Sequence, residues 1–244
     1  MKPTVDIVGR EAFNALLTTR GPLSVERLAE LLRVSRAAVD PLVNEMEEAG
    51  NLIRDGDGDA PIVGVLGLSV VPTQHELDVD GISRWTWCAW DALGLALLLG
   101  DAGVVRSTSP DSGMCIVVRF SNGSVTHDPA EAVLVFAKQQ QNCITVRDWC
   151  PLVNLFESEQ AAQSWMERNG VTGEIQQVHA ASIACAKQYR PLLSRGKRSG
   201  FGWAVRALHA SSYVTGAAWS GLSWWRRFAG VSRRPDQRGQ PPAK

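Results

Sequence analysis

The first 54 residues carry a helical pattern of apolar positions that is interrupted by turn signals. The pattern predicts helices over residues 7–17, 25–32 and 36–49. Ser24 and Ser35 stand directly before the second and third of these helices as N-caps. The third helix presents apolar residues at spacings of three, four and seven, namely Val39, Leu42, Val43 and Met46. Gly50 follows that helix as a C-terminal stop signal.

From residue 62 the chain changes to the period of β-strands. The alternating run from His75 ends in Asp80-Gly81, a strong hairpin signal. Residues 87–100 form an almost wholly apolar helical stretch, which is expected to be buried. Strands are predicted over residues 62–71, 75–79, 82–86, 103–108, 114–120 and 132–137, and helices over residues 158–169 and 176–193. Strands in antiparallel runs that are followed by helices indicate an α+β fold.

These patterns divide the chain into three expected parts. Three helices followed by a short strand pair are typical of a winged helix, so residues 1–60 are expected to form a winged-helix-like helical domain. Residues 61–194 are expected to form a domain with a mixed or antiparallel sheet and packed helices. Residues 195–244 are expected to be a basic, Trp-rich C-terminal extension that is partly disordered.

A winged helix suggests DNA binding, but the charges of the third helix argue against it. One basic residue, Arg36, faces four acidic residues there, namely Asp40, Glu45, Glu47 and Glu48. Neutralisation of phosphate supplies most non-specific affinity for DNA, and an acidic surface repels phosphate. The whole chain is also neutral, with Lys+Arg 25 and Asp+Glu 25. No nucleic-acid partner is therefore expected.

The last 50 residues differ in composition from the rest. They contain ten basic residues against one acid, Asp236, and they also contain Trp203, Trp219, Trp224 and Trp225. Packing against the protein or disorder is the preferred interpretation. Contact with a membrane surface through a Trp/Arg helix is the alternative. A full membrane span is disfavoured because Gly, Ser and His dilute the uncharged stretch.

The chain has five widely spaced cysteines, Cys88, Cys115, Cys143, Cys150 and Cys185. No secretory signal pattern is visible at the start of the sequence, so a cytoplasmic location with reduced thiols is expected. The cysteines are then packing residues, ligands or nucleophiles rather than disulfide partners. Two of them have unusual neighbours: Trp-Cys-Ala-Trp-Asp spans residues 87–91, and Asp-Trp-Cys-Pro spans residues 148–151.

Cys88 and Asp91 are three residues apart and fall on one face of the expected helix. At a helix N-terminus the macrodipole favours the thiolate, so the pKa of Cys88 is expected to be lowered. Asp91 lies in an apolar helix, where burial is expected to raise its pKa and keep a proton available. Thiolate sulfur prefers soft metals. The pair is a candidate for soft-metal chemistry with its own acid, while core packing is the alternative for Cys88 alone.

Two segments resemble the organomercurial (alkylmercury) lyase family. The first is Leu-Ser-Val-Val-Pro-Thr-Gln-His-Glu-Leu-Asp-Val-Asp-Gly at residues 68–81, followed by Trp-Cys-Ala-Trp-Asp-Ala-Leu at residues 87–93. The second, Val-Arg-Asp-Trp-Cys-Pro-Leu-Val-Asn-Leu-Phe at residues 146–156, is similar to the family's later cysteine segment. The resemblance covers about residues 10–193. Pro151 stands where some members carry an additional cysteine.

The resemblance implies that Cys88, Cys150 and Asp91 are the catalytic residues and that they also hold the Hg(II) product. The implied reaction is protonolytic cleavage of a carbon–mercury bond, which gives a hydrocarbon and Hg(II), as part of mercury detoxification. It implies no organic cofactor, in line with the lack of a GxGxxG or P-loop pattern. The implied partners are an organomercurial substrate and, as acceptors of Hg(II), cellular thiols or a mercuric reductase.

Other candidate residues receive simpler interpretations. Cys115 and Cys185 are expected to be structural, whereas Cys143, in a polar stretch, is a candidate for adventitious mercury binding. His75 and His179 are expected to form hydrogen bonds, because mercury prefers sulfur. The aromatic residues around the two cysteines are candidates to wall a dry pocket, namely Trp85, Trp87, Trp90 and Trp149.

Two alternative functions remain open at this point. In the first, the protein is a metal-responsive regulator whose winged helix binds DNA while the cysteines sense metal. In the second, it is a homologue that binds Hg(II) but has lost catalysis. Both keep the cysteines as ligands, so they differ from a lyase in DNA binding or in hydrocarbon release.

Overall fold

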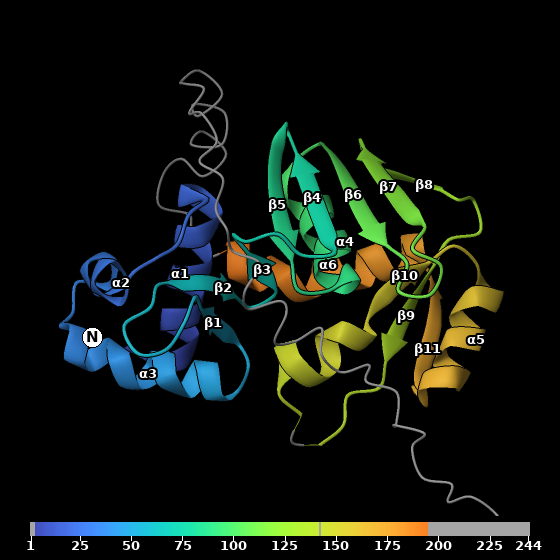
Figure 1. The fold of residues 1–244 in the computed structure, drawn as a ribbon. Helices are drawn as coiled ribbons and strands as arrows, with labels where there is room; N and C mark the ends of the chain where they lie inside the picture. The colour runs from blue at the N-terminus through green and yellow to red at the C-terminus, as the bar shows by residue number, and fades with distance from the viewer. Residues whose placement is uncertain (1–2, 142, 195–244) are drawn as a thin grey trace, which may run out of the picture. The chain divides into compact units, whose positions relative to one another are not determined.

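A computed structural model of the chain describes residues 3–141 and 143–194, and it has an α+β fold (Figure 1). The N-terminal part holds three helices, α1 (Val5–Thr19), α2 (Val25–Leu32) and α3 (Arg36–Glu48). All three predicted helices are confirmed. The Ser24 side chain accepts a hydrogen bond from the Arg27 amide, as expected of an N-cap, whereas the Ser35 side chain makes no such bond.

Eight strands form one antiparallel sheet in the order β1-β2-β3-β5-β4-β6-β7-β8. Their bounds are β1 (Leu52–Arg54), β2 (Ile62–Val65), β3 (Leu68–Ser69), β4 (His75–Val79), β5 (Ile82–Thr86), β6 (Ala102–Thr108), β7 (Cys115–Ser121) and β8 (Ser124–Asp128). The β4–β5 hairpin turns at Asp80 and Gly81, both with positive φ, as the Asp-Gly signal predicts. Alternate residues of β4 and β5 are buried, so one face of this hairpin packs on the core.

The predicted single strand over residues 62–71 is wrong. The structure divides it into β2 and β3, which pair with each other across a tight turn at Leu66 and Gly67. Leu66 has φ 47° and Gly67 has φ 90°, values outside the strand region. Both strands are buried on both faces, so they lack the alternation of apolar and polar residues that would mark their ends. The turn matters because it brings the backbone of Leu66 and Gly67 next to Asp91 and Tyr189.

Two helices pack on each other beside this sheet, α4 (Ala89–Leu99) and α6 (Val178–Ser194) (Figure 1). α4 also contacts strands β4, β5, β6 and β7, which explains why its sequence is apolar on every side. The helix begins two residues later than predicted, because Cys88 has extended backbone dihedral angles and is the N-cap residue. Gly94 of α4 faces Cys185 of α6 so closely that a Cβ atom would contact its sulfur.

A second, three-stranded antiparallel sheet has the order β10-β9-β11. Its strands are β9 (Val133–Ala137), β10 (Asn154–Phe156) and β11 (Gly173–Gln177), and helix α5 (Glu159–Asn169) packs on it through Ala162 and Trp165. Between β9 and β10 lie a π-helical turn, η1 (Thr145–Trp149), and a 3₁₀ turn, η2 (Cys150–Leu152). β8, β10 and β11 were not predicted, because they are short and, in β8 and β11, largely polar.

The three-part division of the chain stays a prediction, and so does the winged-helix description of its first part. Strand β1 pairs with β2 across the expected boundary after residue 60, so hydrogen bonds of the large sheet continue through it. The extension expected over residues 195–244 lies outside the described residues. Within the described residues, no helix combines the length and the apolar composition needed to cross a membrane.

Candidate functional site

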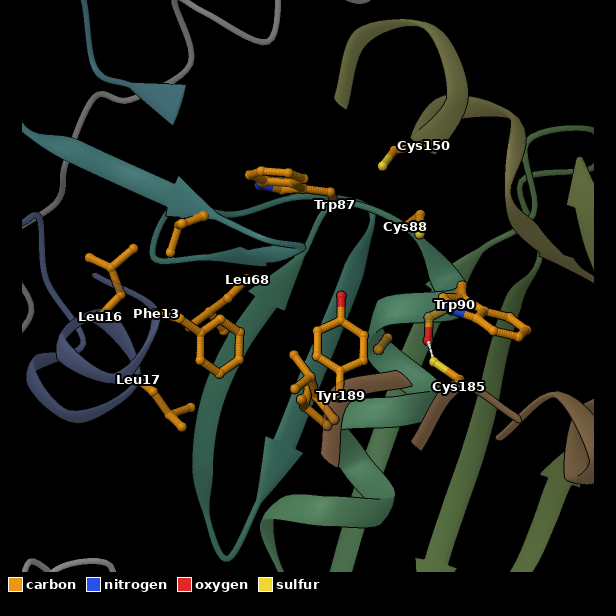
Figure 2. Close-up of a cluster of buried hydrophobic side chains, with 14 of the residues drawn as sticks. Phe13, Leu16, Leu17, Leu68, Trp87, Cys88, Trp90, Cys150, Cys185 and Tyr189 are labelled. Carbon is orange, nitrogen blue, oxygen red and sulfur yellow. Dashed lines mark hydrogen bonds between the residues drawn. The ribbon is translucent and has the colours of Figure 1, made fainter. Parts of the chain in front are cut away.

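The three residues singled out from the sequence come together in the fold. The sulfur atoms of Cys88 and Cys150 and a carboxylate oxygen of Asp91 all lie within 4.8 Å of one another. Metal–thiolate bonds of about 2.3 Å, the value for zinc, put two sulfurs bound to one ion at most about 4.6 Å apart. The two sulfurs therefore stand close to the separation at which a single soft ion bridges them. Figure 2 shows both cysteine side chains near Trp87, although they come from segments that are distant in the sequence.

Cys88 is held where β5 ends and α4 begins. The Thr86 hydroxyl donates a hydrogen bond to the Cys88 carbonyl over 3.0 Å, and the Trp87 amide donates to the Gly67 carbonyl over 2.9 Å. The carbonyl of Cys88 also accepts the first bond of the helix, from Ala92. These contacts fix the N-cap residue from both sides, so the sulfur is directed at the first turn of the helix, where Asp91 lies.

Cys150 is held by the irregular segment that precedes β10. Its carbonyl accepts a hydrogen bond from the Val153 amide, and the Val153 carbonyl in turn accepts one from the Ala89 amide over 3.1 Å. This last bond ties the Cys150 segment directly to the first residue of α4. The Trp149 indole N–H donates to the Ala137 carbonyl over 2.7 Å, which anchors the segment to β9. The large sheet thus positions Cys88 and the small sheet positions Cys150, and the hydrogen bond between Ala89 and Val153 joins the two segments.

Asp91 stands between Cys88 and a residue that the sequence analysis missed, Tyr189. The Cys88 thiol donates to Oδ2 of Asp91 over 3.1 Å, and the Tyr189 hydroxyl lies 2.6 Å from Oδ1. The same hydroxyl lies 3.0 Å from the Leu66 carbonyl oxygen. Asp91 is 5% exposed, so these contacts replace the water that its carboxyl group lacks. In Figure 2 the Tyr189 hydroxyl points toward the segment that carries Trp87 and Cys88.

Burial dominates the electrostatics of both Cys88 and Asp91. It raises the pKa of the Cys88 thiol well above its usual range, and the hydrogen bond with Cys150 and the charge of Asp91 add to this effect. The expected lowering by the helix N-terminus is therefore wrong, because desolvation of the thiolate outweighs the dipole. Burial also raises the pKa of Asp91 to about 6, although hydrogen bonds from Tyr189 and Cys88 oppose the rise. The expected rise for Asp91 is confirmed.

Cys150 is also buried, but unlike Cys88 it lines a cavity. The hydrogen bond with Cys88 acts to lower the pKa of the Cys150 thiol, but burial and the charge of Asp91 more than offset it, and the pKa is raised. Cys150 lines a cavity of about 270 Å³, and Asp91 and Tyr189 line it too. Cys88 is fully buried and does not belong to the cavity wall. A ligand that enters the cavity therefore meets Cys150 first.

The four tryptophans expected around the cysteines divide into two pairs. Trp87 and Trp149 line the cavity and give it large apolar walls. Trp90 instead packs on Phe136, with ring centroids 4.4 Å apart, and its indole N–H donates to Gln188. Trp85 does not line this cavity. The pocket expected from the sequence is thus confirmed for Trp87 and Trp149.

The other candidate residues lie apart from the cluster or serve its packing. His75 is buried and hydrogen-bonded to Ser107 over 2.7 Å, and burial lowers its pKa to about 4. The Cys185 thiol donates to the Trp90 carbonyl in the α4–α6 contact. Cys115 is exposed on β7, and Cys143 is half-buried. None of these side chains joins the group formed by Cys88, Asp91 and Cys150.

A sequence signal for Tyr189 does exist. On α6 the buried residues recur at spacings of three and four, namely Val178, Ala181, Ser182, Cys185, Ala186 and Tyr189. A tyrosine on the buried stripe of a helix needs a partner for its hydroxyl group. The pattern therefore indicates a buried polar contact, but it contains no information about which atom accepts it.

Comparison with known proteins identifies the family. Residues 68–189, half of the chain, match the sequence model of the alkylmercury lyases. The alkylmercury lyase of Streptomyces lividans is 29% identical over 159 residues, which cover 64% of this chain and 70% of that protein. That of Staphylococcus epidermidis is 32% identical over 116 residues, which cover 46% of this chain and about half, 52%, of that protein.

The fold also has a counterpart among solved structures. It is similar to the crystal structure of the mercury-bound form of MerB2, with a TM-score of 0.70 and 22% sequence identity. The similarity covers 78% of this chain and 91% of that one. The family match contains Cys88, Asp91 and Cys150, the three residues that meet in the fold. This chain belongs to the alkylmercury lyase family.

Proposed function

We propose that the protein is an organomercurial lyase that cleaves carbon–mercury bonds and releases a hydrocarbon and Hg(II). The observation that carries the proposal is the buried cluster of two thiols and one carboxyl group at the wall of an apolar cavity. Two soft ligands and an adjacent acid are what this reaction needs: the thiolates bind mercury, and the acid supplies the proton that the carbon atom takes up.

The positions of the groups suggest an order of events. An organomercurial R–Hg–X enters the cavity and meets Cys150, whose thiolate displaces X while its proton leaves as HX. Cys88 then binds the mercury atom, and its thiol proton passes to Oδ2 of Asp91, 3.1 Å away. The carbon–mercury bond breaks with its electron pair on carbon, and Asp91 donates the proton to that carbon. The sum is R–Hg–X plus two thiols giving R–H, HX and Hg(II) bound by two thiolates.

The buried setting of the cluster favours this reaction. A carbanion is an extremely poor leaving group, so protonation must accompany bond breaking. Two thiolates on mercury weaken its bond to carbon by donating electron density. The pKa of Asp91, raised by burial to about 6, makes it a stronger proton acceptor than an ordinary carboxylate and still an acid near neutral pH. The group can therefore both receive and donate the proton.

The proposal includes the fate of the product and the location of the protein. Hg(II) stays on Cys88 and Cys150, with Asp91 as a third ligand, until cellular thiols or a mercuric reductase remove it. The chemistry needs reduced thiols, and Cys88 and Cys150 are both buried and form no disulfide. A cytoplasmic location, where thiols stay reduced, suits this requirement.

The test is release of benzene from phenylmercury acetate by the purified protein in the presence of a small thiol. The wild-type protein is expected to release one benzene per substrate consumed. Cys88→Ala and Cys150→Ala are each expected to lower the rate at least ~100-fold, because one thiolate alone does not activate the bond. Cys115→Ala, which removes an exposed cysteine, is the matched control and keeps the wild-type rate. Benzene release by either site variant at the control rate would remove that cysteine from the mechanism.

The contacts of α3 do not support the alternative of a metal-responsive regulator that binds DNA. Arg36, the one basic residue of α3, pairs with Glu26, Asp40 and Asp59 and is not available to phosphate. A gel-shift assay with DNA, with and without Hg(II), is expected to show no complex. A homologue that only binds Hg(II) would show mercury uptake from phenylmercury without benzene, so the same assay separates that alternative.

A further inference from the structure

We propose that Tyr189 is a positioning residue of the reaction: its hydroxyl holds Oδ1 of Asp91, so that Oδ2 alone faces Cys88 and transfers the proton. The inference rests on the proposed lyase function and adds a residue that acts through Asp91 rather than on mercury. Its basis is the division of partners between the two oxygens of one buried carboxyl group.

The two oxygens of Asp91 have different neighbours. Oδ1 lies 2.6 Å from the Tyr189 hydroxyl, and Oδ2 lies 3.1 Å from the Cys88 sulfur. The two oxygens of a carboxylate are chemically equivalent, so a half-turn about χ2 changes nothing, but this torsion is broad, and intermediate angles turn both oxygens away from Cys88. A short, well-directed bond to one oxygen removes this freedom. The other oxygen is then kept directed at the Cys88 sulfur.

Tyr189 is itself held firmly. Its hydroxyl lies 3.0 Å from the Leu66 carbonyl oxygen, in the turn between β2 and β3. Its ring packs near Phe13, with centroids 6.3 Å apart, and the whole side chain is 4% exposed (Figure 2). The hydroxyl has a single proton, so it donates to Oδ1 when Asp91 is ionised, and it donates to the Leu66 carbonyl when Oδ1 itself carries a proton. The ring cannot swing away without opening the core.

The turn is packed around this contact, because Gly67 approaches the same two groups. A Cβ atom at Gly67 would meet the Tyr189 hydroxyl and would lie 2.6 Å from Cγ of Asp91. The backbone, the phenol and the carboxyl group are therefore packed without spare space. In such packing the orientation of the carboxyl plane is set by its neighbours and not by solvent.

The orientation of the Asp91 carboxyl group matters because the rate of proton transfer depends steeply on it. The proton must reach Oδ2 from Cys88 and must then be delivered to a carbon atom on the cavity side. A misplacement of about 1 Å in such a step costs on the order of 100-fold in rate. Capture of mercury by the two thiols needs no particular orientation of Asp91. The role assigned to Tyr189 therefore separates cleavage from capture.

The experiment compares Tyr189→Phe with Ser182→Ala. The first change removes only the hydroxyl and keeps the ring that packs near Phe13. The second removes another buried hydroxyl of the same helix, one that donates to the Val178 carbonyl and lies outside the cavity wall. Each protein is mixed with phenylmercury, with the protein in excess, so that a single turnover is observed. Protein-bound mercury and released benzene are followed over time. Urea unfolding of both variants measures their stability.

Tyr189→Phe is expected to bind mercury as fast and as completely as wild type but to release benzene ~10–100-fold more slowly. Ser182→Ala is expected to match wild type in both. Benzene release by Tyr189→Phe at the wild-type rate overturns the inference and leaves the proposed function standing. Equal losses of capture and cleavage, or loss of the fold, show a purely structural role and also overturn it. Absence of benzene from the wild-type protein overturns the proposed function, and this inference with it.

Discussion

At the scale of one residue, the buried carboxyl group of Asp91 is reactive but lowers the stability of the folded protein at neutral pH. Burial raises its pKa from 3.8 to about 6, which means that the folded protein holds the neutral acid more readily than the unfolded chain does. A group with a raised folded-state pKa contributes stability that is fully present below pH 4. This contribution is lost as the pH rises through about 6, because the buried carboxylate must then be tolerated.

Replacement of Asp91 by Asn is therefore expected to stabilise the protein at neutral pH. The shift of about two pKa units corresponds to about 3 kcal/mol, which should appear as a widening difference in unfolding free energy between Asp91→Asn and wild type from pH 4 to pH 7. Urea unfolding of both proteins across this range gives the difference, in which the other titrating groups cancel. The variant is also expected to lose benzene release. A constant difference would show that Asp91 titrates normally.

Gly67 is the second residue where local geometry and chemistry meet. Its φ of 90° disfavours any side chain, and a Cβ atom would lie 2.6 Å from Cγ of Asp91. Gly67→Ala is expected to lower the unfolding free energy by about 2–4 kcal/mol and to abolish cleavage, because either the carboxyl group or the turn must move.

Gly113→Ala is the control for the conformational part of this effect. Gly113 has φ 73° and no atom within 4 Å of its Cβ position, so the control retains the strain of a positive φ and omits the collision. It is expected to lose about 1 kcal/mol and no activity. Equal losses in the two variants would mean that backbone strain alone, and not contact with Asp91, makes glycine necessary at position 67.

At the scale of elements, the pairing of α4 with α6 brings the acid and the phenol together. Asp91 lies on the first helix and Tyr189 on the second, and the contact between the helices is close because Gly94 of α4 faces Cys185. Small residues at a helix contact allow the two backbones to approach. The close approach of the two helices thus accompanies the 2.6 Å distance between the Tyr189 hydroxyl and Oδ1 of Asp91.

Gly94→Ala is expected to push the two helices apart. The added Cβ atom would contact the Cys185 sulfur and lie 3.0 Å from the Cys185 backbone carbon, so a loss of about 1–3 kcal/mol is expected in urea unfolding. Addition of Cys185→Ala removes the sulfur and should restore part of the stability, while the backbone contact remains. No recovery in the double variant would locate the conflict elsewhere.

At the scale of the whole molecule, the site depends on two sheets and on residues before position 195. Cys88 and Asp91 follow the large sheet, Cys150 precedes β10 of the small one, and the family match ends at residue 189. A protein lacking residues 196–244 is therefore expected to fold and to release benzene within about two-fold of the full-length rate. A folded but inactive truncation would mean that the extension completes the cavity or delivers substrate.

Helix positions and the β4–β5 hairpin were predictable because their signals are local. Caps, glycine stops and an Asp-Gly turn act over a few residues, and the structure confirms them at Ser24 and at Asp80-Gly81. The turn at Leu66 and Gly67 was missed because both flanking strands are short and buried on both faces. The irregular segment that carries Cys150 was likewise not predicted as η1 and η2, since its shape depends on bonds to distant residues such as Ala137 and Ala89.

The sequence by itself determined the chemistry that is available: two thiols, one acid placed three residues after the first thiol, and a resemblance that assigned them to one reaction. Only the tertiary structure decided their separation, the order in which a ligand meets them, and the state of their protons. The helix dipole predicted a lowered pKa for Cys88, whereas complete burial raises it. Local sequence fixes dipoles and spacing, but desolvation depends on everything that packs around a group, and Tyr189 reaches Asp91 from 98 residues away.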